Sequence, residues 1–379
     1  VFQIESRAQM SMLPRLKPTT FYDLVVEVAI VRPGPIAGGM VHPYLKARER
    51  RAKGQPIHYE RPELEEALGR TLGVPIFQEQ VMQIAMIAAS FTAAEADLLR
   101  RAMAAWKRKG GVHRFRERLL QGMQANGYRA EFAEGIYKQM LGFGEYGFPE
   151  SHAYSFALLA YQSSWLKCHE PACFLAAMLN SQPMGFYGPS QLVQDAQRHG
   201  VQVLPADVSH SDWDCTLALE GAAVRLGLRL VGSLSAEGAQ RIVAARLQAP
   251  FASTEDLSLR AQLDVKDLNA LAAADALQSL SGHRRQQVWD AAARHRAPAL
   301  LRGAPVNEEA LALPPAPEGE EIVFDYAATG LTLRRHPLAL LRPRLARMNY
   351  LNAQQLAALP HGREAAACGL VTVRQQPQT

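Results

Sequence analysis

Apolar residues recur at the spacing of an α-helix along much of this 379-residue chain, and this period constrains its fold more than any other feature. Val81, Ile84 and Ile87 fall on one face of such a helix, with polar Glu and Gln residues between them. Thr92 and Glu95 then form a capping box, in which each side chain accepts an N–H group of the other residue. The pattern therefore predicts a mainly α-helical fold, with residues 1–180 as one helical domain.

Pro and Gly divide the chain into further segments. Glu170-Pro171 separates a long apolar helix, which begins at Ser151 or His152, from a second one. Two β-prone runs flank Gly221 and predict a hairpin of residues 216–220 and 223–228. The expected order after the helical domain is a connector at 181–228, a domain of short helices separated by tight turns at 229–296, a Pro-rich linker at 297–321, a helical connector at 322–362 and the first strand of a further domain within 363–379.

Basic charge is concentrated in two short segments. Arg100–Arg118 holds eight basic residues and one acid, and Lys46–Lys53 holds five and one, although the whole chain has a net charge of only +5. Such a local excess indicates a polyanionic partner, while a solvated helix face would give the same pattern. The residues of the second segment that we expect to contact DNA are Lys46, Arg48, Arg50 and Arg51.

Two adjacent arginines, Arg100 and Arg101, lie near the end of the helix that follows the capping box. Neighbouring side chains on a helix diverge by about 100°. One guanidinium group could pair within the protein while the other points into a cleft, or both could straddle a triphosphate through their forked donors. An exposed basic helix end, favoured by the helix dipole, is the alternative. A basic loop follows and adds Lys107, Arg108 and Lys109.

Other polar motifs admit both a functional and a structural interpretation. Ser151 and His152 stand at a helix N-terminus, where they could bind an anion or cap the helix. Asp212 and Asp214 would point to one face of a strand, as paired magnesium ligands do. No third carboxylate accompanies them in the pattern, so we interpret them as a turn pair and expect no metal site in this chain.

Residues 228–246 have the pattern of a helix-hairpin-helix motif. The N–H groups at the turn of such a motif bind a DNA phosphate without reading the sequence. Gly232 suits the turn, and Ser233 and Ser235 complete the predicted DNA-binding hairpin. A second Gly is usual two positions later and is missing here, which leaves a purely structural pair of helices as the alternative.

Cysteine use and hydropathy exclude two classes of protein. The four cysteines, scattered from Cys168 to Cys368, do not suit a disulfide framework and favour a reducing cytoplasm. No apolar run approaches the roughly 18 residues that a membrane span needs. Because the chain opens on Val1 without a signal peptide, we expect it to be an internal piece of a longer cytoplasmic protein.

Several segments, in their order and spacing, resemble the alpha subunit family of bacterial DNA polymerase III. They are Val1–Arg7, Arg32–Pro35, Gly39–Val41, Gln78–Ala85, Ala96–Met103, Tyr146–Phe148 with Ser151 and His152, and Tyr161–Gln162 with Leu166–Lys167. The resemblance covers nearly the whole chain. It implies polymerase fingers at 1–180, a tandem helix-hairpin-helix DNA-binding domain at 229–296 and the first strand of an oligonucleotide-binding (OB) fold at 363–379.

Within that family the chain is similar to the error-prone, mutagenesis-linked ImuC-type branch. This resemblance is carried by Ala104–Gly111, Phe148–His152, Asn180–Tyr187 and Ser211–Thr216. It implies a DNA-directed DNA polymerase, a nucleotidyltransferase of translesion synthesis and DNA repair, with a replicative alpha subunit or a non-catalytic DNA-binding module as alternatives. The implied ligands are dNTP and primer-template DNA, and the implied phosphate-binding residues are Arg32, Arg100, Arg101, Lys107, Arg108, Lys109, Ser151 and His152.

The resemblance also implies what this chain does not supply. The palm carboxylates of the family, which hold two Mg²⁺ ions, are expected before Val1, so we expect no catalytic residue here and no polymerisation by this chain alone. Residues 297–305 lack the Gln and the aromatic anchor of the clamp-binding peptide of replicative relatives. We therefore expect recruitment to the sliding clamp through an accessory mutagenesis protein.

Overall fold

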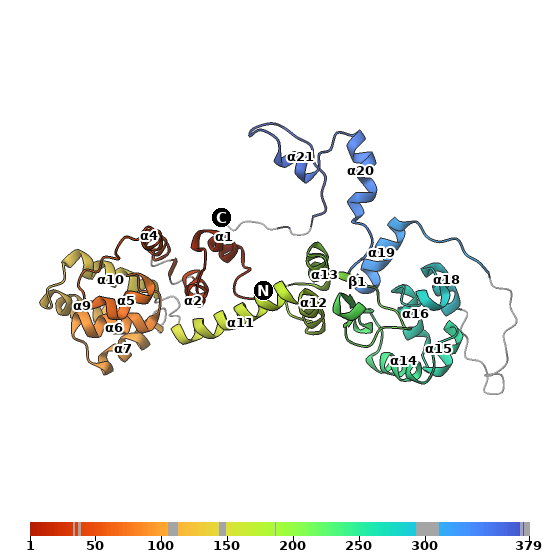
Figure 1. The fold of residues 1–379 in the computed structure, drawn as a ribbon, viewed down its shortest axis with the longest axis horizontal. Helices are drawn as coiled ribbons and strands as arrows, with labels where there is room; N and C mark the ends of the chain where they lie inside the picture. Colours follow the sequence, from red (N-terminus) through yellow and green to blue (C-terminus); the bar gives the residue numbers. More distant parts are fainter. Residues whose placement is uncertain are drawn as a thin grey trace. The chain divides into compact units, whose positions relative to one another are not determined.

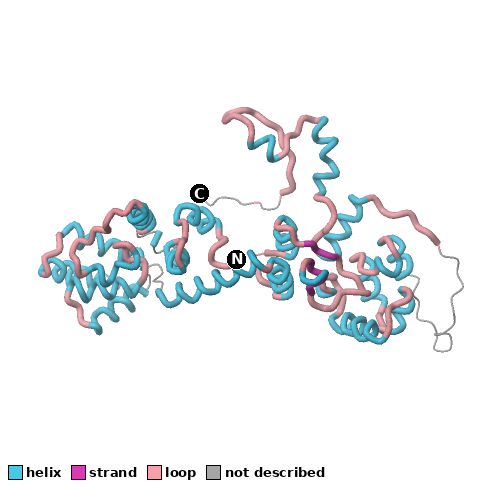
Figure 2. The backbone as a smooth tube through the Cα atoms, viewed as in Figure 1, coloured by secondary structure: helices cyan, strands magenta, loops and turns pink. Residues whose placement is uncertain are grey.

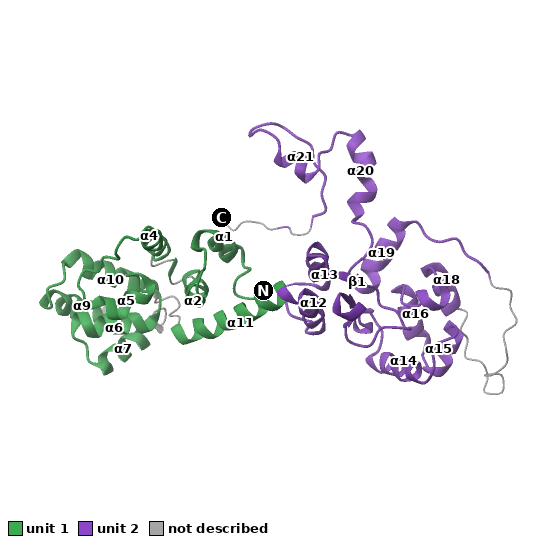
Figure 3. Cartoon of the chain, in the orientation of Figure 1, with its two compact units in different colours: residues 1–168 green, residues 169–379 purple. Residues whose placement is uncertain are grey.

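The computed structural model describes residues 1–32, 35–36, 39–104, 113–143, 149–185, 187–292, 311–371 and 374 (Figure 1). These residues are mainly α-helical and contain a single small sheet, which confirms the predicted fold class (Figure 2). The chain divides into two compact units, Val1–Cys168 and His169–Thr379 (Figure 3). Among the described residues, no helix is both long enough and apolar enough to cross a membrane.

The first unit is a helical bundle in the residues described. Helix α6 packs against α5, α7 and α9, while α10 packs on α7 and α9 (Figure 1). Phe77, Ile84 and Leu99 are buried in the core that these helices share. The helices of the unit are α1 (Arg7–Leu16), α2 (Phe21–Ile30), α4 (Val41–Ala52), α5 (Leu64–Leu68), α6 (Gln78–Ala89), α7 (Ala93–Ala104), α9 (His113–Ala125), α10 (Ala130–Phe143) and α11 (Glu150–His169).

The predicted start of α7 is confirmed in detail. The Thr92 N–H donates to Glu95 Oε2 at 2.7 Å, and the Glu95 N–H donates to Thr92 Oγ1 at 3.2 Å. These two bonds satisfy N–H groups that have no partner within the helix. The reciprocal box therefore sets where α7 begins.

The second unit combines helices with the sheet. Its first part contains α12 (Pro171–Asn180), α13 (Pro189–Arg198), β1 (Gln202–Leu204), β2 (Thr216–Ala218) and β3 (Ala223–Arg225). Its second part contains α14 (Ala236–Gln248), α15 (Thr254–Arg260), α16 (Val265–Ala273), α17 (Gln278–Ser281), α18 (Arg284–Ala292), α19 (Glu318–Thr329), α20 (Pro337–Arg347) and α21 (Ala353–Ala357). A separate apolar core, including Leu228, Ile242 and Leu271, holds the sheet and the helices around it together.

The sheet has the strand order β1-β3-β2. Strands β2 and β3 are antiparallel, with Leu217 opposite Val224, so the predicted hairpin is confirmed. Strand β1 pairs with β3 in parallel and was missed by the sequence analysis. Its three residues are too short to show an alternating pattern.

Helix α12 packs with the sheet of the second unit, although the sequence analysis placed the domain border after residue 180. The Asn180 side chain donates to the Cys215 carbonyl oxygen at 2.9 Å and accepts the Cys215 N–H at 2.7 Å. Both bonds tie the end of α12 to the start of β2. The first compact unit correspondingly ends at Cys168.

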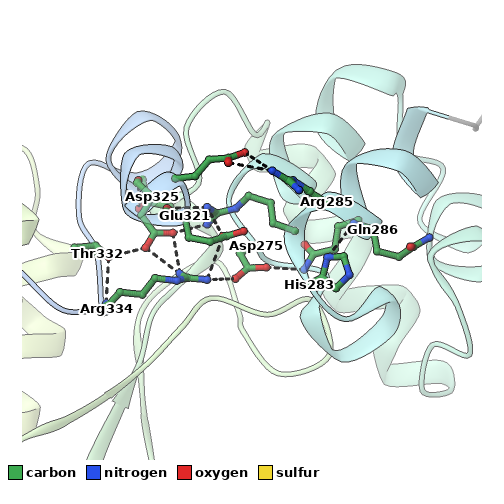
Figure 4. A network of polar contacts seen from close by, with 12 residues as sticks. Asp275, His283, Arg285, Gln286, Glu321, Asp325, Thr332 and Arg334 are labelled. Carbon is green, nitrogen blue, oxygen red and sulfur yellow. Dashed lines mark hydrogen bonds and ion pairs between the residues drawn. The ribbon is translucent and has the colours of Figure 1, made fainter. Parts of the chain in front are cut away.

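Helix α19 corrects the predicted linker, because residues 318–321 are helical. Charged side chains attach this helix to α18 and to the loop after α16 (Figure 4). Buried Arg284 pairs with Glu321 at 2.8 Å and also with Asp325. Arg334 pairs with Asp325 and with Asp275, each at 2.9 Å. Helix α19 is thus packed into the second unit by ion pairs.

The strand expected near the C-terminus is reduced to one bridge in the described residues. Leu351 and Ala367 form a parallel bridge, and the Leu351 N–H donates to the Ala366 carbonyl oxygen at 2.9 Å. Thr372 and Val373 lie outside the described residues. A longer strand would need a paired neighbour for each of its N–H and C=O groups.

Candidate nucleotide and DNA interface

Helix α7 has one face in the core and one face in solvent. Ala96, Leu99 and Met103 are buried at helical spacing. Arg100 and Arg101 lie off this face, with side chains that are 36% and 69% exposed. The packing of α7 therefore presents two cations that the sequence predicted to bind phosphate.

Both guanidinium groups meet at Asp97, which the sequence analysis did not single out. Asp97 Oδ1 accepts hydrogen bonds from Arg100 Nε at 3.0 Å and from Arg100 Nη2 at 2.8 Å. Asp97 Oδ2 pairs with Arg101 Nη2 at 2.7 Å. The hydrogen bond from Arg100, and then the charges of both arginines, hold the pKa of Asp97 below its ordinary value. The sequence did hold a signal for Asp97, because an acid on a helix can pair with basic residues that lie three and four positions after it.

The predicted residues at the start of α11 lie at a helix N-terminus that already has a carboxylate. The Glu150 N–H donates to Glu79 Oε2 at 3.0 Å. Ser151 is exposed, and its carbonyl oxygen accepts the Ser155 hydroxyl at 3.0 Å. The ring of exposed His152 meets Phe156 edge-on, with centroids 4.5 Å apart. Within the described ranges, no hydrogen bond or ion pair brings Ser151 to the arginine pair of α7.

The other predicted phosphate-binding residues divide into one that is anchored and three that lie outside the described residues. Arg32 donates through Nη2 to Gln3 Oε1 at 2.8 Å and through Nε to the Val28 carbonyl oxygen at 3.2 Å. These bonds hold the start of the chain against the end of α2. The residues outside the described part are Lys107, Arg108 and Lys109.

Helix α4 carries the second basic segment, and its arginines are not equivalent. Lys46, Arg50 and Arg51 are exposed. Arg48 instead pairs with Asp23 of α2, with Nη2 at 3.0 Å from Oδ2. Burial alone would raise the pKa of Asp23, but the hydrogen bonds from Arg48 and from two backbone N–H groups hold it far below its ordinary value. Arg48 therefore fastens α4 to α2.

Two N–H groups of the predicted DNA-binding hairpin, those of Gly232 and Ser235, are engaged within the chain. Ser233 adopts a φ of 68°, the left-handed region that suits a tight turn. The Gly232 N–H donates to the Ala328 carbonyl oxygen at 2.8 Å, and the Ser235 N–H donates to Asp267 Oδ1 at 2.9 Å. A phosphate at this turn would compete with both acceptors.

The carboxylates of Asp212 and Asp214 form ion pairs with two different arginines. Asp212 Oδ1 lies 2.6 Å from Arg246 Nη2, and Asp214 Oδ1 lies 2.7 Å from Arg229 Nη1. This geometry matches two structural ion pairs. In the part of the chain that the structure describes, no three His, Cys, Asp or Glu side chains gather as metal ligands.

Comparisons with known proteins connect this geometry to a family. Residues 1–127 match the bacterial DNA polymerase III alpha subunit finger domain, and residues 200–287 match a helix-hairpin-helix motif. The whole chain is 62% identical, over 384 residues, to an error-prone DNA polymerase of Bordetella bronchiseptica. The chain thus contains a finger domain of the DNA polymerase III alpha subunit type and a helix-hairpin-helix motif. The arginine pair on α7 lies within the matched finger domain.

Further relatives show the same similarity. Error-prone DNA polymerases of Methylococcus capsulatus and Pseudomonas fluorescens are each 57% identical, over 401 and 393 residues. Each alignment covers this whole chain but only 38% of the relative, and 36% of the Bordetella polymerase. The chain therefore spans little more than a third of the length of these polymerases.

Proposed function

We propose that this chain supplies the nucleotide-binding fingers and part of the DNA-binding surface of an error-prone DNA polymerase. That polymerase would act in translesion synthesis and repair in the cytoplasm. The observation that carries the proposal is the Arg100–Arg101 pair on α7, with Arg101 exposed and Arg100 partly exposed, within the matched finger domain. The parent reaction joins the α-phosphate of a dNTP to a primer 3′ oxygen and releases pyrophosphate. Two guanidinium groups beside the β- and γ-phosphates would stabilise the charge that develops on this leaving group.

Divalent metal chemistry would come from the remainder of the polymerase. Two Mg²⁺ ions held by palm carboxylates would clamp the attacking and leaving oxygens. The described residues of this chain hold no such carboxylate cluster. Its own share of the reaction is to bind and orient the triphosphate.

Primer-template DNA would meet the exposed cations of α4, namely Lys46, Arg50 and Arg51, with Arg48 holding that helix in place. Such contacts to phosphate give affinity without sequence preference, which suits a polymerase. For Gly232, Ser233 and Ser235, DNA binding remains a prediction. A phosphate bound to the Gly232 or Ser235 N–H group would have to replace the Ala328 carbonyl oxygen or Asp267, respectively.

Substitution of the arginine pair in the complete polymerase tests the nucleotide role. We expect Arg101→Ala and Arg100→Ala each to lower kcat/KM for nucleotide incorporation by about tenfold or more, with primer-template affinity nearly unchanged, since each removes a charge-assisted contact worth about 1.5–3 kcal/mol. Arg129→Ala, which removes an exposed arginine paired with Glu60, is the matched control. Unchanged incorporation in both arginine variants would leave a non-catalytic DNA-binding module as the better interpretation.

Recruitment to the sliding clamp is proposed to be indirect, through an accessory mutagenesis protein. The segment concerned, residues 297–305, lies outside the described residues, so this proposal rests on its composition. It offers no aromatic anchor, and such anchors dominate small interfaces. An immobilised peptide spanning residues 294–313 should show no clamp binding at micromolar concentration. Micromolar or tighter binding would establish a direct clamp motif.

A further inference from the structure

Arg100 and Arg101 are neighbours in sequence and therefore leave α7 in directions about 100° apart, yet both reach one carboxylate. We propose that Asp97 is a positioning residue that gathers the two guanidinium groups into a single fork for the triphosphate of the incoming nucleotide. This inference rests on the nucleotide role proposed above.

The spacing explains how one acid holds both cations. Side chains on a helix lean toward its N-terminus, so residues three and four positions after an acid can both fold back onto it. Arg100 approaches Asp97 Oδ1 through Nε and Nη2, and Arg101 approaches Oδ2 through Nη2. Each carboxylate oxygen thus fixes one guanidinium group.

Donors remain for a ligand after these contacts are made. A guanidinium group carries five N–H donors, and Asp97 engages only one edge of each. Within the described residues, no protein acceptor other than Asp97 bonds to the Arg100 or Arg101 side chain. With 36% and 69% of the two side chains exposed, the free donors can face a triphosphate.

The negative charge of a carboxylate beside a phosphate site opposes anion binding. Asp97 can therefore favour binding only by holding the two arginine side chains in fixed conformations. Without Asp97, two like charges on adjacent positions would separate, and each long side chain would sample many rotamers. Fixing such a side chain on binding costs roughly 0.5–1.5 kcal/mol. Holding both in advance removes that cost from nucleotide binding.

The test measures binding of deoxynucleoside triphosphate and of inorganic tripolyphosphate to this chain by calorimetry. We expect Asp97→Asn to weaken both affinities about three- to tenfold, although it makes the chain more positive. Glu134→Gln changes the charge equally and removes another surface pair, with Arg116 at 3.1 Å, so it should not weaken binding. Asp97→Glu restores the charge and should recover much of the affinity. In the complete polymerase, Asp97→Asn should raise KM for the nucleotide and leave kcat nearly unchanged.

Two outcomes separate this inference from the proposed function. If Asp97→Asn binds as tightly as the unchanged chain or more tightly, while Arg100→Ala and Arg101→Ala bind weakly, Asp97 is only a counter-charge and the inference is overturned. If the arginine variants also bind normally, the nucleotide role itself fails. Thermal melting of each variant establishes that it is folded.

Discussion

The Tyr22 hydroxyl donates a 2.6 Å hydrogen bond to Glu150 Oε1 and so joins α2 to the first residue of α11. Arg70 pairs with the same carboxylate at 3.0 Å, and its guanidinium group lies 5.7 Å from the centre of the Tyr22 ring. Burial, and then the hydrogen bond to Glu150, raise the pKa of Tyr22 above its ordinary value. These contacts hold the first turn of α11, which carries Ser151 and His152.

Removing the Tyr22 hydroxyl tests this joint. We expect Tyr22→Phe to lower the free energy of unfolding by about 1–2 kcal/mol, because the ionised Glu150 loses a donor that water replaces only in part. Tyr154→Phe on α11 removes a hydroxyl from a half-exposed ring and should change little. Urea unfolding of both variants measures the difference. Equal stabilities would show that the hydrogen bond does not hold α11.

Glu27 of α2 should make the chain less stable as the pH rises. Its side chain is fully buried, and neither carboxylate oxygen has a hydrogen-bond partner among the described residues. Burial raises the pKa of Glu27 from an ordinary 4.5 to about 7. Between these two values the unfolded chain has released the proton and the folded chain has kept it. Stability therefore falls across that window and stays low above pH 7.

Glu27→Gln removes this titration while keeping the shape of the side chain. We expect the variant to exceed the unchanged chain in unfolding free energy by up to about 3 kcal/mol above pH 7, with the difference shrinking toward zero below pH 4.5. Denaturant unfolding at several pH values measures it. A difference that is constant with pH would contradict a buried, unpaired carboxyl.

Gly232 should not tolerate a larger residue. A Cβ atom there would lie 2.7 Å from the Ala328 carbonyl oxygen, which accepts the Gly232 N–H. We expect Gly232→Ala to cost on the order of 1–3 kcal/mol and to speed hydrogen exchange in α19. Gly188→Ala in the same unit meets no atom within 4 Å and serves as the control. Unchanged exchange in α19 would show that it docks independently of this hairpin.

DNA binding by this chain should depend steeply on salt, because cations that contact phosphates release counterions. We expect Arg50→Ala to lower the slope of log affinity against log salt by up to about 0.9, the value for one phosphate contact on duplex DNA. Lys138→Ala, an exposed lysine outside both basic segments, should leave the slope unchanged. Fluorescence anisotropy with duplexes of two unrelated sequences measures both effects. A flat titration between low and moderate salt would rule out the proposed DNA contact.

The sequence by itself determined the features that depend on neighbouring residues. Thr92 and Glu95 begin α7 through their own hydrogen bonds, and Pro171 begins α12, where its missing N–H costs nothing. The hairpin of β2 and β3 also lies within a few residues of its turn. Arg100 and Arg101 could be chosen as candidate phosphate ligands because their motif is continuous in the chain.

Only the tertiary structure decided which polar groups remain available. Arg48 looks like its basic neighbours in the sequence but pairs with Asp23, which is 25 positions away. The Gly232 N–H finds its acceptor in Ala328, on a helix beyond the linker. Such partners follow from which helices pack together, and a bond between distant segments leaves no period in the sequence. A buried charge or N–H group takes whichever partner that packing brings within reach, because leaving it unpaired would cost more.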